Sequence, residues 1–255
     1  MNSWYNNTFD DTVASDAAKS RLDIDWMNTN RFYVNEAQYA NLYISSSLVS
    51  NANFPDLVKY AYGKNIKFGL AYSQTSQIDT LLNYNNGSNT TIDKKLWYAV
   101  TELEPYNTGD YAGMTSKMQY AYPKLRAAGL RHGVYMGWPT ASYWETIVAN
   151  SDFINLHCYR ASSSMTASGI WGYVQERLGF IAAACKKLGK IMEVNIIYSC
   201  EPSFAYDYFK ANKWTSGHQL FLSEFNTKAT LDMKRFLVVD DFSIFVTKFG
   251  KEIKP

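Results

Sequence analysis

The stretch from residue 152 to residue 199 contains two short apolar runs on either side of a longer amphipathic one. The runs are DFINLHCY (152–159), IWGYVQERLGFIAAACKKLG (170–189) and KIMEVNIIYS (190–199). The outer runs have the length of buried strands, whereas the middle run has a helical pattern and stops at Gly189. This order predicts a βαβ unit, in which the two strands are parallel.

The same alternation continues on both sides of this stretch. Further strand-like runs occupy residues 40–45, 67–73, 96–104, 131–138, 219–226 and 235–245, and 31–35 is an additional candidate. Helical patterns lie between them at 54–65 and 115–129. Eight or nine such runs favour a closed (β/α)8 barrel, which needs about 250 residues, over an open sheet. We therefore predict an α/β fold with a single (β/α)8 TIM-barrel domain over residues 1–255, of which 1–30 form an irregular N-terminal extension.

Composition and charge argue against several classes of protein. The 255 residues carry 25 basic and 23 acidic side chains without a basic block, so we expect no nucleic-acid partner. No apolar run reaches the roughly 18 residues of a membrane span. The three cysteines form no CxxC pair, the three histidines are far apart, and no glycine-rich phosphate-binding motif occurs. We therefore expect neither a metal nor an organic cofactor.

The first twelve residues bear on the cellular compartment. MNSWYNNTFDDT has neither the basic nor the apolar segment of a signal peptide. N-x-S/T sequons begin at Asn6, Asn86 and Asn89, but such sequons are common by chance. We expect a secreted or cell-surface protein whose signal has been removed, with a cytoplasmic protein as the alternative.

Aromatic side chains are the strongest positive signal in the composition. They make up 16% of the residues, and many follow directly after apolar runs. An aromatic face with a polar edge suits a polyhydroxylated ring, whose C–H face is apolar and whose rim is hydrated. We expect a saccharide as the ligand, and a tyrosine-rich core and surface is the simpler alternative.

Carboxylates stand near the ends of two predicted strands. In LWYAVTELEPYN (96–107), Glu102 and Glu104 share a face, because residues two apart point the same way in a strand. In QLFLSEFN (219–226), Glu224 follows a strongly apolar run. The carboxyl ends of barrel strands face the active site, and two carboxyl groups across a cleft can cleave a glycosidic bond. The alternatives are that Glu104 sits past the strand end, that Glu102 pairs with a nearby lysine or arginine, and that Glu224 forms a buried ion pair.

The other predicted strand ends supply polar and aromatic groups that could contact a ligand. They are Tyr106, Trp138, His157, Tyr159, Tyr198 and Asn226. His157 lies inside an apolar run, where a histidine is as often a hydrogen-bonded core residue as a ligand contact. Glu193 lies early in its run, which favours a structural role.

Several of these segments resemble the TIM-barrel glycoside hydrolases, above all the retaining enzymes of clan A. Residues 129–160 resemble strands five and six of that clan, LEPYN (103–107) resembles its N-E-P motif, and LFLSEFN (220–226) resembles its nucleophile strand. The resemblance implies that Glu104 is the general acid/base and Glu224 the nucleophile. It also implies that Trp138, His157 and Tyr159 shape the sugar subsite.

Two features depart from that pattern and introduce a second resemblance. Leu103 stands where the clan has asparagine, and the run 190–199 is one strand too many before Glu224. Chitinase-like barrels accommodate the extra strand, with Glu104 as the last residue of their D-x-x-D-x-D-x-E motif. Trp97, Val100 and Glu102 occupy its three aspartate positions. A barrel that binds saccharides without cleaving them is therefore a further hypothesis.

Overall fold

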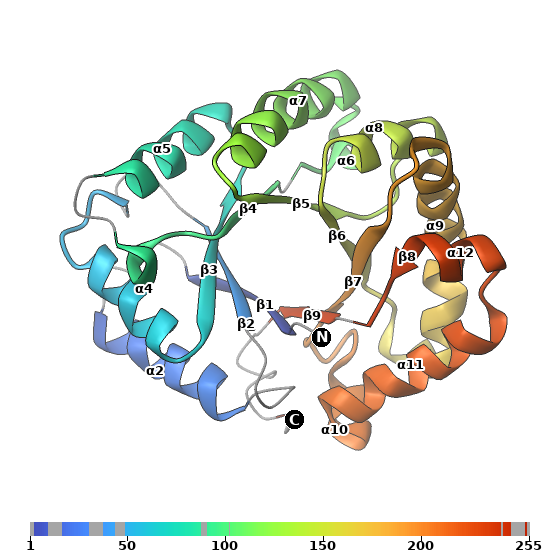
Figure 1. Ribbon diagram of the computed structural model, residues 1–255. Helices are drawn as coiled ribbons and strands as arrows, with labels where there is room; N and C mark the ends of the chain where they lie inside the picture. The colour runs from blue at the N-terminus through green and yellow to red at the C-terminus, as the bar shows by residue number, and fades with distance from the viewer. Residues whose placement is uncertain are drawn as a thin grey trace.

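Eight parallel strands form a closed ring in this computed structural model. It describes residues 3–9, 17–30, 38–43, 49–87, 91–101, 103–240, 242–245 and 253. In chain order the ring consists of β1 (Ser3–Phe9), β2 (Gln38–Tyr43), β3 (Ile66–Tyr72), β4 (Tyr98–Thr101), β5 (Arg131–Met136), β6 (Phe153–Cys158), β7 (Met192–Ser199) and β9 (Phe242–Phe245). Neighbours pair in this order, and β9 closes the ring between β7 and β1. The predicted (β/α)8 barrel is confirmed (Figure 1).

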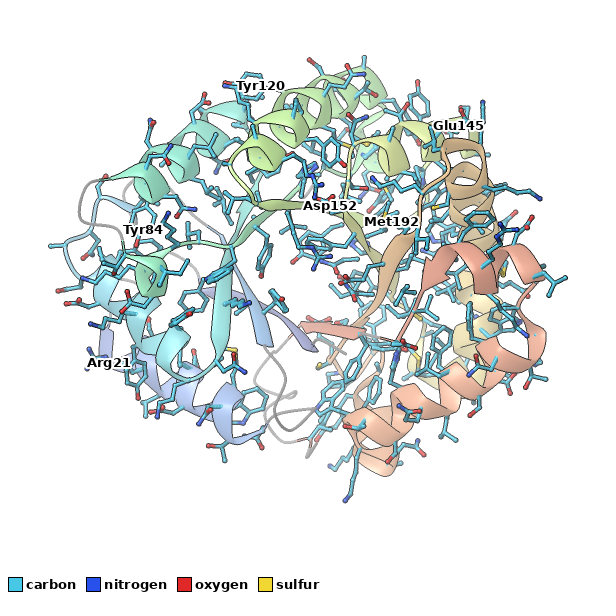
Figure 2. The ribbon with its side chains drawn as sticks, viewed as in Figure 1. Arg21, Tyr84, Tyr120, Glu145, Asp152 and Met192 are labelled. Atoms are coloured by element: carbon cyan, nitrogen blue, oxygen red, sulfur yellow. The ribbon has the colours of Figure 1, made fainter. Side chains whose placement is uncertain are left out.

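Helices surround this ring on the outside (Figure 1). They are α2 (Ala17–Thr29), α4 (Phe54–Gly63), α5 (Thr75–Asn86), the short α6 (Pro105–Thr108), α7 (Tyr111–Ala127), α8 (Trp144–Ala149), α9 (Ala167–Leu188), α10 (Tyr206–Asn212), α11 (Trp214–Lys228) and α12 (Leu231–Phe236). Tyr120 of α7 and Glu145 of α8 project away from the barrel (Figure 2). Helix α9 begins at the cap residue Thr166 and ends at Gly189, whose φ of 62° lies in the left-handed region that glycine adopts readily.

The barrel interior is filled by side chains from the inward faces of the strands. Tyr98 and Val100 of β4, Tyr135 of β5 and Phe153 of β6 belong to one buried cluster. The Tyr98 ring leaves room only for a glycine at position 69, because a Cβ there would lie 2.1 Å from the ring. Val100 faces inward, whereas Glu104 lies beyond the last residue of β4 and Glu102 lies outside the described residues.

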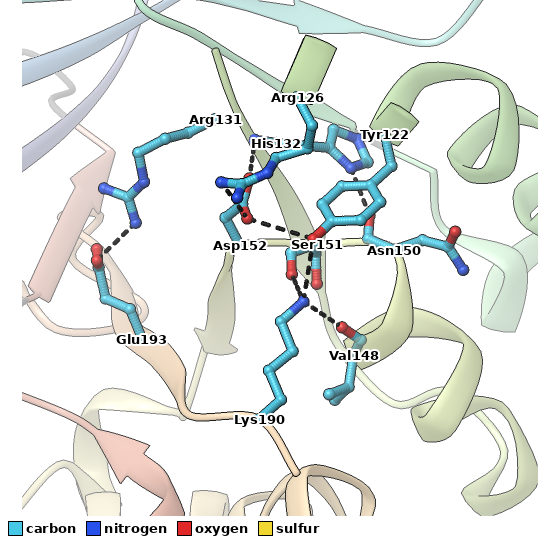
Figure 3. Close-up of polar contacts among 10 residues, drawn as sticks. All are labelled: Tyr122, Arg126, Arg131, His132, Val148, Asn150, Ser151, Asp152, Lys190 and Glu193. Carbon is cyan, nitrogen blue, oxygen red and sulfur yellow. Dashed lines mark hydrogen bonds and ion pairs between the residues drawn. The ribbon is translucent and has the colours of Figure 1, made fainter. Parts of the chain in front are cut away.

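A polar network joins the beginnings of β5, β6 and β7 to the ends of the surrounding helices α7 and α8 (Figure 3). Asp152 accepts a hydrogen bond from the His132 backbone amide at 2.8 Å, and its carboxylate forms an ion pair with Arg126 at 3.3 Å. The His132 ring places Nδ1 2.6 Å from the Asn150 carbonyl oxygen. The Lys190 ammonium donates to the Val148 and Ser151 carbonyls near the end of α8. In a TIM barrel the end where the strands begin serves stability, whereas the opposite end carries the active site.

Two sequence-based predictions of secondary structure are wrong. Within the predicted irregular extension, residues 3–9 and 17–29 are regular, because they form the barrel strand β1 and the helix α2. Residues 219–226 are not a strand but the second half of α11. The buried residues of α11 recur every three to four positions, so the apolar run is one face of an amphipathic helix.

The last predicted strand, 235–245, is only partly correct. Helix α12 continues to Phe236, and the two-residue strand β8 (Leu237–Val238) pairs with the beginning of β7. Strand β9 then closes the barrel as expected. The additional candidate 31–35 lies outside the described residues.

Candidate active site

Glu104 lies at the carboxyl end of strand β4, where the chain turns into the short helix α6. It occupies the N-cap position of that helix, three residues after β4 ends at Thr101. Its Oε1 accepts a hydrogen bond from the Tyr106 hydroxyl at 3.0 Å, and its Oε2 accepts one from the Asn107 amide at 2.7 Å. These two donors hold the carboxylate at the carboxyl end of the barrel, where Glu104 sits past the end of the strand rather than within it.

Tyr106 connects Glu104 to the neighbouring strand ends. Its hydroxyl lies 3.4 Å from Nδ1 of His157, which belongs to β6. The same hydroxyl lies against Gly137 at the end of β5, where a Cβ would be only 2.8 Å away. Burial, followed by the negative charge of Glu104, raises the pKa of Tyr106. The hydroxyl therefore stays protonated at neutral pH and can donate to Glu104.

The sequence left open whether His157 is a core residue or a ligand contact. In the structure the side chain is buried and also faces the candidate site. The side chain is 9% exposed, and burial followed by the charge of Arg177 lowers its pKa to about 3. The imidazole is therefore neutral at physiological pH and does not act as a charged acid. Tyr159 stacks on it with the ring centroids 4.7 Å apart and the planes 17° from parallel.

Trp138 is the most exposed aromatic side chain among the predicted contacts. It lies two residues after the end of β5 and is 45% exposed. The edge of Tyr173 supports it, with ring centroids 5.4 Å apart and planes at 87°. An exposed indole face held in this way is a surface on which a sugar ring can stack.

A cavity of about 430 Å³ opens beside Glu104. Its lining consists of Leu103, Glu104, Pro105, Thr108, Asp110, Met114 and Lys117. The volume is within the usual range for a small-molecule site, about 300–1,000 Å³. Glu104 therefore contacts Tyr106, which in turn lies beside His157, and it also lines a cavity that a ligand could enter.

Three of the predicted site residues lie elsewhere. Glu224 is on helix α11, where it pairs with Lys228 at 2.5 Å, so the prediction that it follows a barrel strand is wrong. Asn226 lines a separate cavity together with β8, which pairs with the beginning of β7 at the opposite end of the barrel. Tyr198 faces the helices, fully buried, with its hydroxyl 3.2 Å from Nδ1 of His218.

Glu102 lies outside the described residues.

Glu201 is an active-site candidate that the sequence analysis missed. It is exposed and follows the end of β7 at Ser199 by two residues, which places it at the same end of the barrel as Glu104. The sequence could have indicated Glu201, because the run 190–199 is itself the seventh strand and Glu201 follows it. The mistaken strand at 219–226 directed attention to Glu224 instead.

The described residues contain no group of three or more histidine, cysteine, aspartate or glutamate side chains that could hold a metal ion. Within the same part of the chain, no helix is both long and apolar enough to cross a membrane.

Comparison with solved structures identifies the fold. A chitinase from Chromobacterium violaceum superposes with a TM-score of 0.53 and 9% identity, covering 98% of this chain and 96% of that one. A mutant β-1,3-glucanosyltransferase from Rhizomucor miehei, in complex with laminaritriose, gives 0.56 and 11% over 96% and 86%. The chain therefore shares the (β/α)8 barrel fold of these proteins. Triosephosphate isomerase from Bartonella henselae also matches, at 0.50 and 10% over 99% and 96%. No protein-family model and no curated protein sequence matches the chain.

The matches support the fold expected from the sequence resemblance, and at these identities they support nothing finer. Triosephosphate isomerase shows that the same barrel can carry unrelated chemistry. Function has to be argued from the residues at the site.

Proposed function

We propose that this protein is a carbohydrate-acting barrel in which Glu104 gives a proton to the glycosidic oxygen and later takes one from the attacking water. The observation that supports this most strongly is the fixed Glu104 carboxylate at the carboxyl end of β4, held by Tyr106 and Asn107 beside an open cavity. Trp138 and Tyr159 supply the aromatic surface that a sugar needs, and Glu102 remains a proposed contact.

The second carboxylate of the proposed reaction is Glu201. It takes the place that the sequence resemblance gave to Glu224, because it follows strand seven and Glu224 does not. In a retaining reaction, the Glu104 proton passes to the glycosidic oxygen while the C–O bond breaks. The Glu201 carboxylate forms an ester with the anomeric carbon. Water then attacks that carbon, loses its proton to Glu104 and releases Glu201 as a carboxylate.

A saccharide-binding barrel without catalysis is the second candidate. It is favoured because the described polar contacts of the Glu104 carboxylate come from Tyr106 and Asn107, neither of which is a second acid. A chitinase-like reaction is a variant of the first proposal, in which the substrate's own acetamido group replaces the protein nucleophile. The strand numbers fit that variant, since DFINLHCY is strand six and NIIYS belongs to strand seven.

The test measures cleavage of laminarin and chitin oligosaccharides by chromatography of the products. We expect Glu104→Gln to reduce turnover at least 100-fold on whichever glycan is cleaved, while the chain stays folded. Glu201→Gln should do the same on laminarin-type substrates and should have little effect if the acetamido group is the nucleophile. The matched control is Glu224→Gln, which should remain fully active.

Unchanged turnover in the folded Glu104→Gln variant would refute the proposed catalytic role. Binding of the oligosaccharides by the wild-type protein, without cleavage of any of them, would select the non-catalytic alternative.

A further inference from the structure

Arg177 is a buried cation that the proposed reaction does not use. It lies on helix α9 and is only 1% exposed. Burial lowers its pKa to about 10, so the guanidinium keeps its charge at neutral pH. Among the described ion pairs none involves Arg177, and burying a cation without a counter-ion normally costs several kcal/mol. Because no described ion pair offsets this cost, we expect the buried guanidinium to have a specific role.

The guanidinium instead binds three backbone carbonyls. Nη1 donates to the Gly137 carbonyl at 3.0 Å and to the His157 carbonyl at 2.9 Å, while Nη2 donates to Tyr173 at 2.8 Å. Gly137 follows β5 and His157 lies near the end of β6, so one side chain joins two adjacent strand ends from outside. The planar fork of arginine can reach all three acceptors, whereas a lysine ammonium on its flexible stem cannot hold the same geometry.

The same guanidinium supports the exposed aromatic surface. Its carbon atom Cζ lies 3.9 Å from the centroid of the Trp138 ring and 4.9 Å from that of Tyr173. A cation at this distance from a ring face is attracted to it, the more so where water is excluded. Trp138 therefore has one face on Arg177 and a further contact with Tyr173, and 45% of the side chain is exposed.

Each of these contacts leads to a group at the candidate site. Gly137 is the residue against which the Tyr106 hydroxyl packs, and that hydroxyl donates to Glu104. His157 places Nδ1 beside the same hydroxyl. A displacement of either strand end would move Tyr106 relative to Glu104, and a loss of the cation would free Trp138.

We propose that Arg177 is a positioning residue of the carbohydrate site, which sets the place of Tyr106 beside Glu104 and of the Trp138 ring at the rim. The proposal rests on the proposed function for its effect on activity, but its effect on Trp138 is independent of any reaction.

The experiment compares Arg177→Lys, Arg177→Met and the control Lys187→Met. Lys187 lies on the same helix, and its exposed ammonium pairs with Glu145 at 2.7 Å, so the control also removes a cation from α9. The first measurement is the indole N–H resonance of Trp138 in a ¹⁵N-labelled sample, assigned with Trp138→Phe. The second is kcat and KM for laminaritriose and chitotriose, with unfolding curves for every variant.

We expect both Arg177 variants to shift or broaden the Trp138 resonance, while Lys187→Met leaves it unchanged. On the cleaved substrate, kcat should fall at least tenfold because Glu104 loses its fixed partner, and KM should rise because Trp138 is no longer held. Lysine should fail to rescue either effect, since it keeps the charge and loses the fork.

A folded Arg177→Lys protein with the wild-type Trp138 resonance would overturn the proposal. Loss of folding in both variants would also overturn it, by showing that Arg177 serves the fold alone. If the wild-type protein neither binds nor cleaves the two saccharides, the proposed function fails, and the Trp138 resonance still decides whether Arg177 positions the rim.

Discussion

Acidification from pH 7 to pH 5.5 should strongly destabilise the fold, because all three histidines are buried as neutral rings. Burial lowers the pKa of His132 to about 4, and it lowers the pKa values of His157 and His218 to about 3. His132 is part of the network at the beginning of β5 and β6 (Figure 3). Its Nε2 lies 2.7 Å from the Tyr72 hydroxyl. His218 lies between α11 and β7, beside Tyr198.

The sign and size of the effect follow from linkage. In the unfolded chain each histidine has a pKa of about 6.5, so the unfolded state binds protons below that pH while the native state does not. Lowering the pH from 7 to 5.5 therefore favours unfolding by about 1.3 kcal/mol per histidine, or about 4 kcal/mol for three. Domains have stabilities of about 5–15 kcal/mol, so this is a large share. The lowered pKa values of Asp79 and Asp93 act only at lower pH, because unfolded carboxyls titrate near pH 4.

Urea unfolding at pH 7.0, 6.5, 6.0 and 5.5 measures this loss directly. We expect the free energy of unfolding to fall by about 4 kcal/mol across the series, with the slope increasing toward three protons per chain. A ¹⁵N histidine spectrum of the folded protein at pH 5.5 should show three neutral rings. A loss below about 1 kcal/mol, or a folded spectrum containing imidazolium at pH 5.5, would refute the account of the buried rings.

Two further predictions concern the rim. Gly137→Ala would place a Cβ 2.7 Å from Cζ of Tyr106, so the ring must move by several tenths of an ångström. The hydrogen bond from the Tyr106 hydroxyl to the Glu104 carboxylate is worth about 1.5–3 kcal/mol, because one partner is charged. We expect this bond to weaken, and kcat/KM to fall about tenfold or more as a result. Gly172→Ala, where nothing lies within 4 Å, is the control that should stay active, and equal activities of the two variants would contradict the packing argument. Trp138→Ala should raise the Kd for bound oligosaccharide about tenfold in calorimetric titrations while leaving the unfolding curve nearly unchanged, because the ring is 45% exposed. An unchanged Kd would remove Trp138 from the sugar site.

Most of the barrel could be predicted from the sequence, because buried parallel strands are continuous apolar runs. The runs beginning near residues 67, 131, 152 and 190 all became strands within about two residues of the expected bounds. Helix α9 was equally clear, since its apolar face is long and Gly189 ends it.

The error at residues 219–226 arose because a short apolar run does not reveal its period. QLFLSEFN has the composition of a strand, yet His218, Phe221, Leu222 and Phe225 form the buried face of a helix. Strand β1, SWYNNTF, was missed for the opposite reason, because its polar residues conceal a barrel strand. Both errors concern segments in which tertiary packing decides between the alternatives.

The candidate site could be predicted only where a residue follows a correctly placed strand. Glu104, Trp138 and His157 were found because the ends of β4, β5 and β6 were correct. Tyr198 was misplaced by a single position, since neighbouring residues of a strand face opposite sides. Arg177 could not be found, because its contacts with Gly137 and His157 join residues 40 and 20 positions apart.

The most direct test of the carbohydrate site is a crystal structure of the Glu104→Gln protein soaked with laminaritriose and, separately, with chitotriose. The account predicts a sugar ring against Trp138 and a glycosidic oxygen within hydrogen-bond distance, about 3 Å, of the residue 104 side chain. A saccharide bound at another part of the surface, with the cavity beside residue 104 empty, would contradict it.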